Sequence, residues 1–291
     1  QANFAQGILD LANDGADVIV DDIFYFGEPF FQDGVIAQAV DQVAAQGVPY
    51  FSSAGNAARQ SYASTSFNTV TVNQNDDTPV YDFDPSASTD TLQQVTIPVV
   101  ESPDLAPTIS FQWDDPFFSV TGDPNFAADA DLDIYLLDKQ AADTLASSTI
   151  DNVAFGDPVE IVGFFNDGSV DADGDGTADE TFQIKIEKVG GSDPGRIKYF
   201  WSGVMTVNEF ASDSPTSFGH SIASGGAGRP DHFVNVFRET DVSAALAASV
   251  EVPLYFTTLG GDPVVIEAEP QTIQEGTLFV HRPDSAGPRS Q

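Results

Sequence analysis

Hydrophobic positions in the opening part of the chain recur at helical spacing. Apolar side chains return every three or four residues over 2–13, and VIAQAVDQVAA at 35–45 has the same period, so both segments are predicted to be helices. Short apolar runs at 17–20 and 48–51 predict two buried strands. The order of strand, helix and strand predicts a parallel β–α–β arrangement for this part of the chain.

The pattern changes after about residue 75. Helical spacing gives way to short runs rich in β-branched and aromatic residues, separated by Pro, Gly, Asp and Asn. These runs are Val95–Val100, Thr108–Trp113, Leu132–Leu137, Val159–Phe164, Thr181–Val189 and Ile197–Trp201. Several short strands at such spacing predict an antiparallel β-sandwich.

Composition narrows the function classes. Of 291 residues, 41% are hydrophobic, which is enough for a substantial core, and 45 acidic against 10 basic residues give a net charge of −35. Such a field disfavours nucleic-acid partners and anionic membrane surfaces. The absence of cysteine excludes disulfides and zinc–thiolate sites. No apolar run approaches the roughly 18 residues of a membrane span, so no membrane insertion is expected.

A turn of small residues follows the second predicted strand. Ser53, Ala54 and Gly55 allow the backbone to turn sharply, and Asn56 then lies at the carboxyl edge of the predicted sheet. An amide at such a place can donate a hydrogen bond to an oxyanion. The alternative is an ordinary turn capped by asparagine.

This order of elements, ending in S-A-G-N, resembles the subtilisin-like serine proteases (subtilases). The resemblance implies that Asn56 belongs to an oxyanion hole and that the reaction is peptide-bond hydrolysis through an acyl-enzyme, with a protein or peptide substrate. It also implies that Tyr25, Phe26 and Gly27 border a substrate groove, although aromatic packing under a loop explains them equally well. The sequence leaves three roles open for Asp21 and Asp22: polar residues at a strand end, ligands of a cation, or groups that set substrate specificity.

The middle of the chain resembles the jelly-roll modules that accompany secreted bacterial peptidases, through FQWDDP at 111–116 and ADLDIYL at 130–136. Short segments that resemble subtilase sequences occur again at 255–261 and 282–284. The implied fold class is α/β, with a partial subtilisin-like parallel sheet interrupted by an inserted antiparallel β-sandwich. The expected domains are an N-terminal α/β part at 1–74, the insert at 75–209, and a truncated α/β continuation at 210–291.

The catalytic triad is not visible. Motifs for the aspartate and histidine are absent, and Ser221 in GHSIAS imitates a nucleophile motif without the proline that should follow it. Ser221 is therefore a weak nucleophile candidate, and we expect a fragment of a longer secreted protein that is inactive alone. The rival hypothesis is a calcium-dependent β-sandwich that binds protein or glycan, with non-catalytic α/β flanks. A non-catalytic homologue of the proteases is a third alternative.

The sharpest metal signal lies at 167–180. Aspartates spaced two apart and followed by glycine supply hard oxygen ligands around a tight turn, which suits Ca²⁺. The expected ligand set is Asp171, Asp173, Asp175, Thr177 and Asp179. The alternative is a solvated acidic hairpin tip. A second acidic group, at 129–133, is a weaker candidate, because alternation along a strand predicts that its odd-numbered acids point outward.

Overall fold

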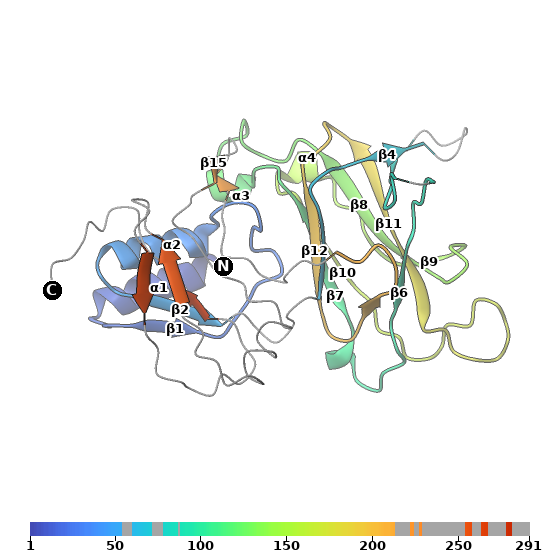
Figure 1. Cartoon of the computed structure of the whole chain (residues 1–291), viewed down its shortest axis with the longest axis horizontal. Coiled ribbons are helices and arrows are strands. Elements are labelled where there is room, and N and C mark those ends of the chain that lie inside the picture. Colours follow the sequence, from blue (N-terminus) through green and yellow to red (C-terminus); the bar gives the residue numbers. More distant parts are fainter. Residues whose placement is uncertain are drawn as a thin grey trace. The chain divides into compact units, whose positions relative to one another are not determined.

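The computed structural model describes residues 1–53, 60–71, 78–86 and 88–212, together with short strands at 222–223, 227–228, 254–257, 263–266 and 278–280 (Figure 1). The chain forms two compact units. Unit 1 comprises Gln1–Arg59 and Ser217–Gln291, and unit 2 comprises Gln60–Thr216.

Unit 1 begins with two helices and two strands in alternation: α1 (Ala2–Asn13), β1 (Ile19–Asp21), α2 (Val35–Ala45) and β2 (Tyr50–Ser53). Strands β1 and β2 are parallel, and β18 (Leu278–Val280) pairs antiparallel with the other edge of β2. Two further antiparallel pairs are β14 (Ile222–Ala223) with β15 (Ala227–Gly228), and β16 (Leu254–Thr257) with β17 (Pro263–Ile266).

The core of unit 1 forms where the apolar stripes of the two helices meet the strands. Ile8 of α1 and Val43 of α2 are buried together with Ile19 and Tyr50 of the two parallel strands. The helical period of the sequence is thus explained by burial of one face of each helix.

Unit 2 contains a four-stranded sheet in the order β10 (Val159–Gly163), β7 (Thr108–Trp113), β12 (Ile197–Ser202) and β3 (Ser61–Ser64). Every neighbouring pair in this sheet is antiparallel.

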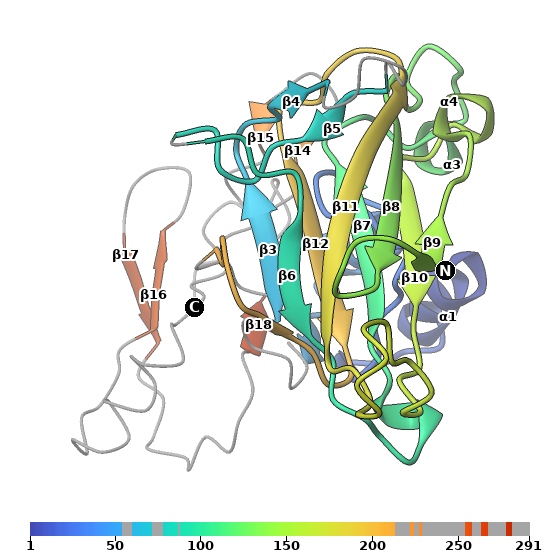
Figure 2. The same ribbon diagram turned by 90° about the vertical axis from the view of Figure 1, so that its right-hand side faces the viewer.

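A larger sheet is built around the long strand β11 (Thr181–Gly190) (Figure 2). One edge of β11 pairs with β6 (Gln93–Thr96) and β5 (Val80–Tyr81), and the other pairs with β8 (Asp131–Leu137). Beyond these strands lie β13 (Thr206–Val207), β4 (Thr69–Val70) and β9 (Thr144–Ser148). The connections hold the 3₁₀ helix Pro103–Leu105 and two short helices, α3 (Phe118–Thr121) and α4 (Asn152–Phe155).

The two sheets of unit 2 share one hydrophobic core. Alternate residues of β7, Ile109, Phe111 and Trp113, are buried with the alternate residues Phe182, Ile184 and Ile186 of β11. The period of two along these strands sends one set of side chains into the space between the sheets. This geometry defines a β-sandwich.

The prediction of an α/β fold with a subtilisin-like parallel sheet is wrong. Among the described strands, β1 and β2 form a parallel pair and the remaining pairings are antiparallel. Within the part of the chain that the structure describes, the β–α–β pattern at the start is local and does not extend into a larger parallel sheet. Strand β4 also joins the sheet of β11 rather than that of β1.

Where the chain is described, no helix combines the length and the apolar character needed to cross a bilayer.

The backbone of Asp129 lies too close to Gly191 for any side chain to fit there. Gly191 has φ +78°, and a Cβ there would lie 1.7 Å from the carbonyl oxygen of Asp129. We expect Gly191→Ala to lower the free energy of unfolding by about 2–4 kcal/mol, because it adds a clash to the cost of a left-handed backbone. Urea unfolding followed by tryptophan fluorescence measures the loss.

Gly122→Ala is the matched control. Gly122 also has a positive φ, +64°, but a Cβ there would meet nothing within 4 Å. We expect this variant to lose only the roughly 1–2 kcal/mol of unfolding free energy that a left-handed backbone costs a residue with a Cβ. Equal losses in the two variants would contradict the packing at Gly191.

Candidate functional site

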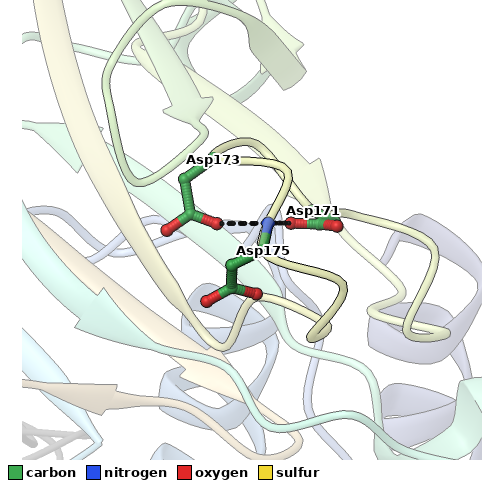
Figure 3. A group of neighbouring side chains, drawn as sticks. All are labelled: Asp171, Asp173 and Asp175. Atoms are coloured by element: carbon green, nitrogen blue, oxygen red, sulfur yellow. Dashed lines mark hydrogen bonds between the residues drawn. The ribbon is translucent and has the colours of Figure 1, made fainter.

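Three aspartates converge in the connection between β10 and β11. Carboxylate oxygens of Asp171, Asp173 and Asp175 all lie within 4.8 Å of one another, and the three residues are exposed (Figure 3). We call this segment, residues 171–175, the acidic loop. Three like charges this close repel one another unless a cation or hydrogen-bond donors compensate them.

Backbone N–H groups supply part of that compensation. The backbone nitrogen of Asp175 donates to Asp171 Oδ1 at 3.1 Å and to Asp173 Oδ1 at 3.3 Å. The backbone nitrogen of Gly176 donates to Asp171 Oδ2 at 2.9 Å. The loop reaches these positions because Gly174 and Gly176 adopt φ +70° and +84°, a region that favours glycine.

A lysine from elsewhere in the chain binds one side of the acidic loop. Lys139, in the turn between β8 and β9, forms ion pairs with Asp173, at 2.6 Å, and with Asp179. Hydrogen bonds to Asp173 and Asp179 raise the pKa of Lys139, and the hydrogen bond from Lys139 lowers the pKa of Asp173. No motif in the sequence points to Lys139, because 34 positions (173 minus 139) separate it from Asp173.

The structure divides the expected ligand set. Asp171, Asp173 and Asp175 are brought together, whereas the side chain of Asp179 is buried and accepts a hydrogen bond from the backbone nitrogen of Ala172 at 2.7 Å. The backbone nitrogen of Thr177 donates to Asp175 Oδ1 at 2.7 Å. Asp179 therefore holds Lys139 and the loop backbone, and the exposed acidic group is smaller than the predicted five residues.

The second acidic group follows the alternation of β8. Leu132 and Ile134 enter the core between the sheets, and Asp131 and Asp133 occupy the other face of the strand. Asp133 is nevertheless buried and accepts a hydrogen bond from the Tyr135 hydroxyl at 2.8 Å. Asp131 accepts one from the backbone nitrogen of Asn152. These contacts give both aspartates a structural role.

Glu160 of β10 is a fully buried carboxylate. The Ser148 hydroxyl donates to its Oε2, and the backbone nitrogen of Ile150 donates to its Oε1 at 3.0 Å. Burial raises the pKa of Glu160 to about 7, and the charge of Asp133 adds to the rise, while these hydrogen bonds oppose it. Glu160 therefore keeps its proton in the folded state at pH values where an unfolded glutamate has lost it.

The raised pKa of Glu160 predicts how stability changes with pH. Between about pH 4.5 and 7 Glu160 is more protonated in the folded state than in the unfolded state, so this group's contribution to stability falls as pH rises. Glu160→Gln removes the titration and leaves an amide that can bond to Ser148. We expect the loss of stability between pH 5 and pH 8 to be smaller in the variant by about 1–3 kcal/mol.

Urea unfolding at both pH values measures the difference. Glu101→Gln, at an exposed glutamate, removes the same formal charge and should leave the pH dependence near that of the parent. Parallel curves for the parent and Glu160→Gln would show that Glu160 ionises normally.

In unit 1, a carboxylate connects the two parallel strands. The hydroxyl of Tyr50 and that of Ser52, at 2.7 Å, both donate to Asp21 at the end of β1. Burial, with the charge of Asp21 as a second cause, raises the pKa of Glu28 to about 7. Of the alternatives left open for Asp21, these contacts match a polar strand-end residue.

Two of the three groove residues expected from the sequence pack on neighbouring aromatic rings. Tyr25 packs edge-on against Phe4 of α1, with ring centroids 5.7 Å apart, and Phe26 does so against Phe24 at 5.1 Å. A Cβ at Gly27 would lie 3.5 Å from the Gln1 side chain. A cleft of about 420 Å³ lies instead between α1 and β1. Its lining includes Ile8, Leu11, Val20, Asp21 and Tyr50, and none of the three expected groove residues.

The two residues expected to take part in catalysis, Asn56 and Ser221, lie outside the described residues.

Comparison with known proteins returns short similarities. A 29-residue segment is 69% identical to imidazole glycerol phosphate synthase subunit HisF of Staphylococcus saprophyticus, covering 10% of this chain and 12% of that protein. The HisF subunits of Yersinia pestis and Metallosphaera sedula are 72% and 66% identical over 29 residues, which is 11% and 12% of their lengths. The chain thus spans about a tenth of the relatives it matches.

No family model matches the chain, and no solved structure matches it.

The resemblance to subtilases, and with it the assignment to the serine proteases, is wrong. The similarities found are to HisF, and the described strands form mostly antiparallel sheets. The motif that carried the resemblance consists of four small residues at a strand end, a composition that many turns share. A 29-residue similarity does not show which family this chain belongs to.

Proposed function

We propose that unit 2 is a calcium-binding β-sandwich that serves as a secreted binding module. The main support for this proposal is the convergence of Asp171, Asp173 and Asp175, whose carboxylate oxygens lie within 4.8 Å of one another on an exposed loop. Calcium takes six to eight hard oxygen ligands in flexible geometry, and carboxylates, backbone carbonyls and water all serve. Three aspartates supply the charged part of such a set.

The ion pair of Lys139 supports a preference of the acidic loop for cations. The Lys139 ammonium is held by Asp173 and by the buried Asp179, so one positive charge already lies beside three exposed carboxylates. A divalent ion bound to Asp171 and Asp175 would supply the rest of the compensation. Lys139 then competes for Asp173, and its position links metal binding to the turn between β8 and β9.

The calcium affinity expected of the acidic loop and the net charge of the chain both favour a setting outside the cell. Sites of extracellular modules bind calcium with dissociation constants of about 10⁻⁴–10⁻³ M, and we expect an exposed loop with one competing lysine to bind in this weak range. The net charge of −35 and the lack of cysteine suit a soluble secreted module. In this proposal its partner is a protein or peptide, and the flanking unit 1 carries no assigned chemistry.

Calcium titration tests the proposal. We expect isothermal titration calorimetry on the full chain to show saturable Ca²⁺ binding, and Ca²⁺ at a hundredfold excess over its dissociation constant to stabilise the fold by about 2.7 kcal/mol. Asp171→Asn should weaken binding by about tenfold or more, because it removes a ligand charge. Lys139→Gln should strengthen binding, because the competing ammonium is lost.

Asp104→Asn is the matched control. Asp104 is an exposed aspartate in the connection between β6 and β7, so its substitution changes net charge by the same amount and should leave calcium binding unchanged. The absence of binding heat and of a thermal shift at millimolar Ca²⁺ would overturn the proposal. So would equal weakening by Asp171→Asn and Asp104→Asn, because binding would then be diffuse.

A further inference from the structure

Large apolar side chains gather on two short helices of unit 2. Phe118 of α3 is 39% exposed, Phe126 of the following loop 47%, and Val153 and Phe155 of α4 50% and 71%. We call these four residues the α3–α4 surface. Single exposed apolar residues are ordinary, whereas larger apolar patches rimmed by polar residues mark interaction sites.

Backbone contacts hold the parts of this surface together. The backbone nitrogen of Phe118 donates to the carbonyl of Gly156 at 2.9 Å, and a Cβ at Gly156 would lie 2.5 Å from Phe118 Cβ. Gly156 directly follows Phe155, so the start of α3 lies against the end of α4 (Figure 2). The Thr121 hydroxyl donates to the carbonyl of Phe126 at 2.7 Å, which fixes the loop beside α3.

Aspartates border the α3–α4 surface. Asp151 caps α4 by accepting from the backbone nitrogen of Ala154 at 2.9 Å, and Asp157 accepts from that of Ser119 at 2.8 Å. Asp123 lies in the loop between α3 and Phe126. The sequence contains no Lys or Arg over 60–138 or over 140–184. The apolar side chains therefore stand among negative charges with no basic residue in the same segments.

We propose that the α3–α4 surface binds a cationic amphipathic segment of a partner protein. The apolar side of such a segment would cover the phenylalanines, and its lysines or arginines would pair with the bordering aspartates. Aromatic side chains supply most of the binding energy of interfaces, and the charge pattern speeds encounter and rejects acidic partners. Anionic lipid and nucleic acid are disfavoured by the same charges.

The inference deepens the proposed function, on which it rests, by naming the partner of the binding module. The surface is separate from the acidic loop. Strand β8 begins at Asp131, which bonds to Asn152 of α4, and ends just before Lys139, which binds Asp173. A seven-residue strand spans about 20 Å. Partner binding and calcium binding can therefore fail independently.

A synthetic amphipathic helix of leucine and lysine is the probe, with the same helix built of leucine and glutamate as its counterpart. Fluorescence anisotropy with the full chain should show saturable binding of the lysine peptide that weakens as salt rises, and no binding of the glutamate peptide. Phe155→Ser and Phe126→Ser should each weaken binding by about tenfold, the size of a moderate interface anchor. Val189→Ser, at a 55% exposed position of β11, should leave binding unchanged.

Several outcomes would overturn the inference: no saturable binding of the lysine peptide, equal affinity for the glutamate peptide, or equal effects of Phe155→Ser and Val189→Ser. Sedimentation with phosphatidylcholine vesicles that is lost in Phe155→Ser would also overturn it, because the surface would then bind lipid. Measurements in EDTA and in calcium separate the two proposals. Peptide binding without calcium binding refutes the metal site alone, and calcium binding without peptide binding refutes the α3–α4 surface alone.

Discussion

The packing of two antiparallel sheets against each other is the interaction on which unit 2 depends. Phe111 and Trp113 of β7 and Phe182 and Ile184 of β11 are wholly or almost wholly buried between the sheets. Burying aromatic and branched side chains supplies the main favourable term of folding. Because these residues alternate along their strands, the intervening side chains face away from the space between the sheets. The acidic loop and the α3–α4 surface lie on connections between strands of the sandwich.

A protein with this many acids also needs to compensate its carboxylates, and unit 2 does so largely with backbone N–H groups. Asp114 accepts from the backbone nitrogens of Gly195 and Arg196, and Asp115 accepts from those of Asp129 and Ala130. Each carboxylate thereby orders the turn around it. The acidic loop differs in two ways. Its three carboxylates lie close together, and Lys139 from another turn forms an ion pair with one of them, Asp173.

The local hydrophobic pattern of the sequence predicted several helices and strands well, but it predicted the pairing of distant strands poorly. Helices α1 and α2 and strand β7 have the bounds that periodicity gives, since one buried face imposes a clear repeat. The direction of strand pairing is not written in any local repeat, so the parallel sheet was wrong. Likewise the aspartate spacing indicated the acidic loop, but the ion pair of Lys139 and the burial of Asp179 depend on tertiary contacts that no motif carries.

The central claim is that the acidic loop of the sandwich holds a calcium ion, and a crystal structure grown in calcium chloride tests it most directly. The account predicts an anomalous-scattering peak bounded by oxygens of Asp171, Asp173 and Asp175, with the Lys139 ammonium moved away from Asp173. Crystals that show the three carboxylates with no such peak, and Lys139 still paired to Asp173 as it is here, would contradict it.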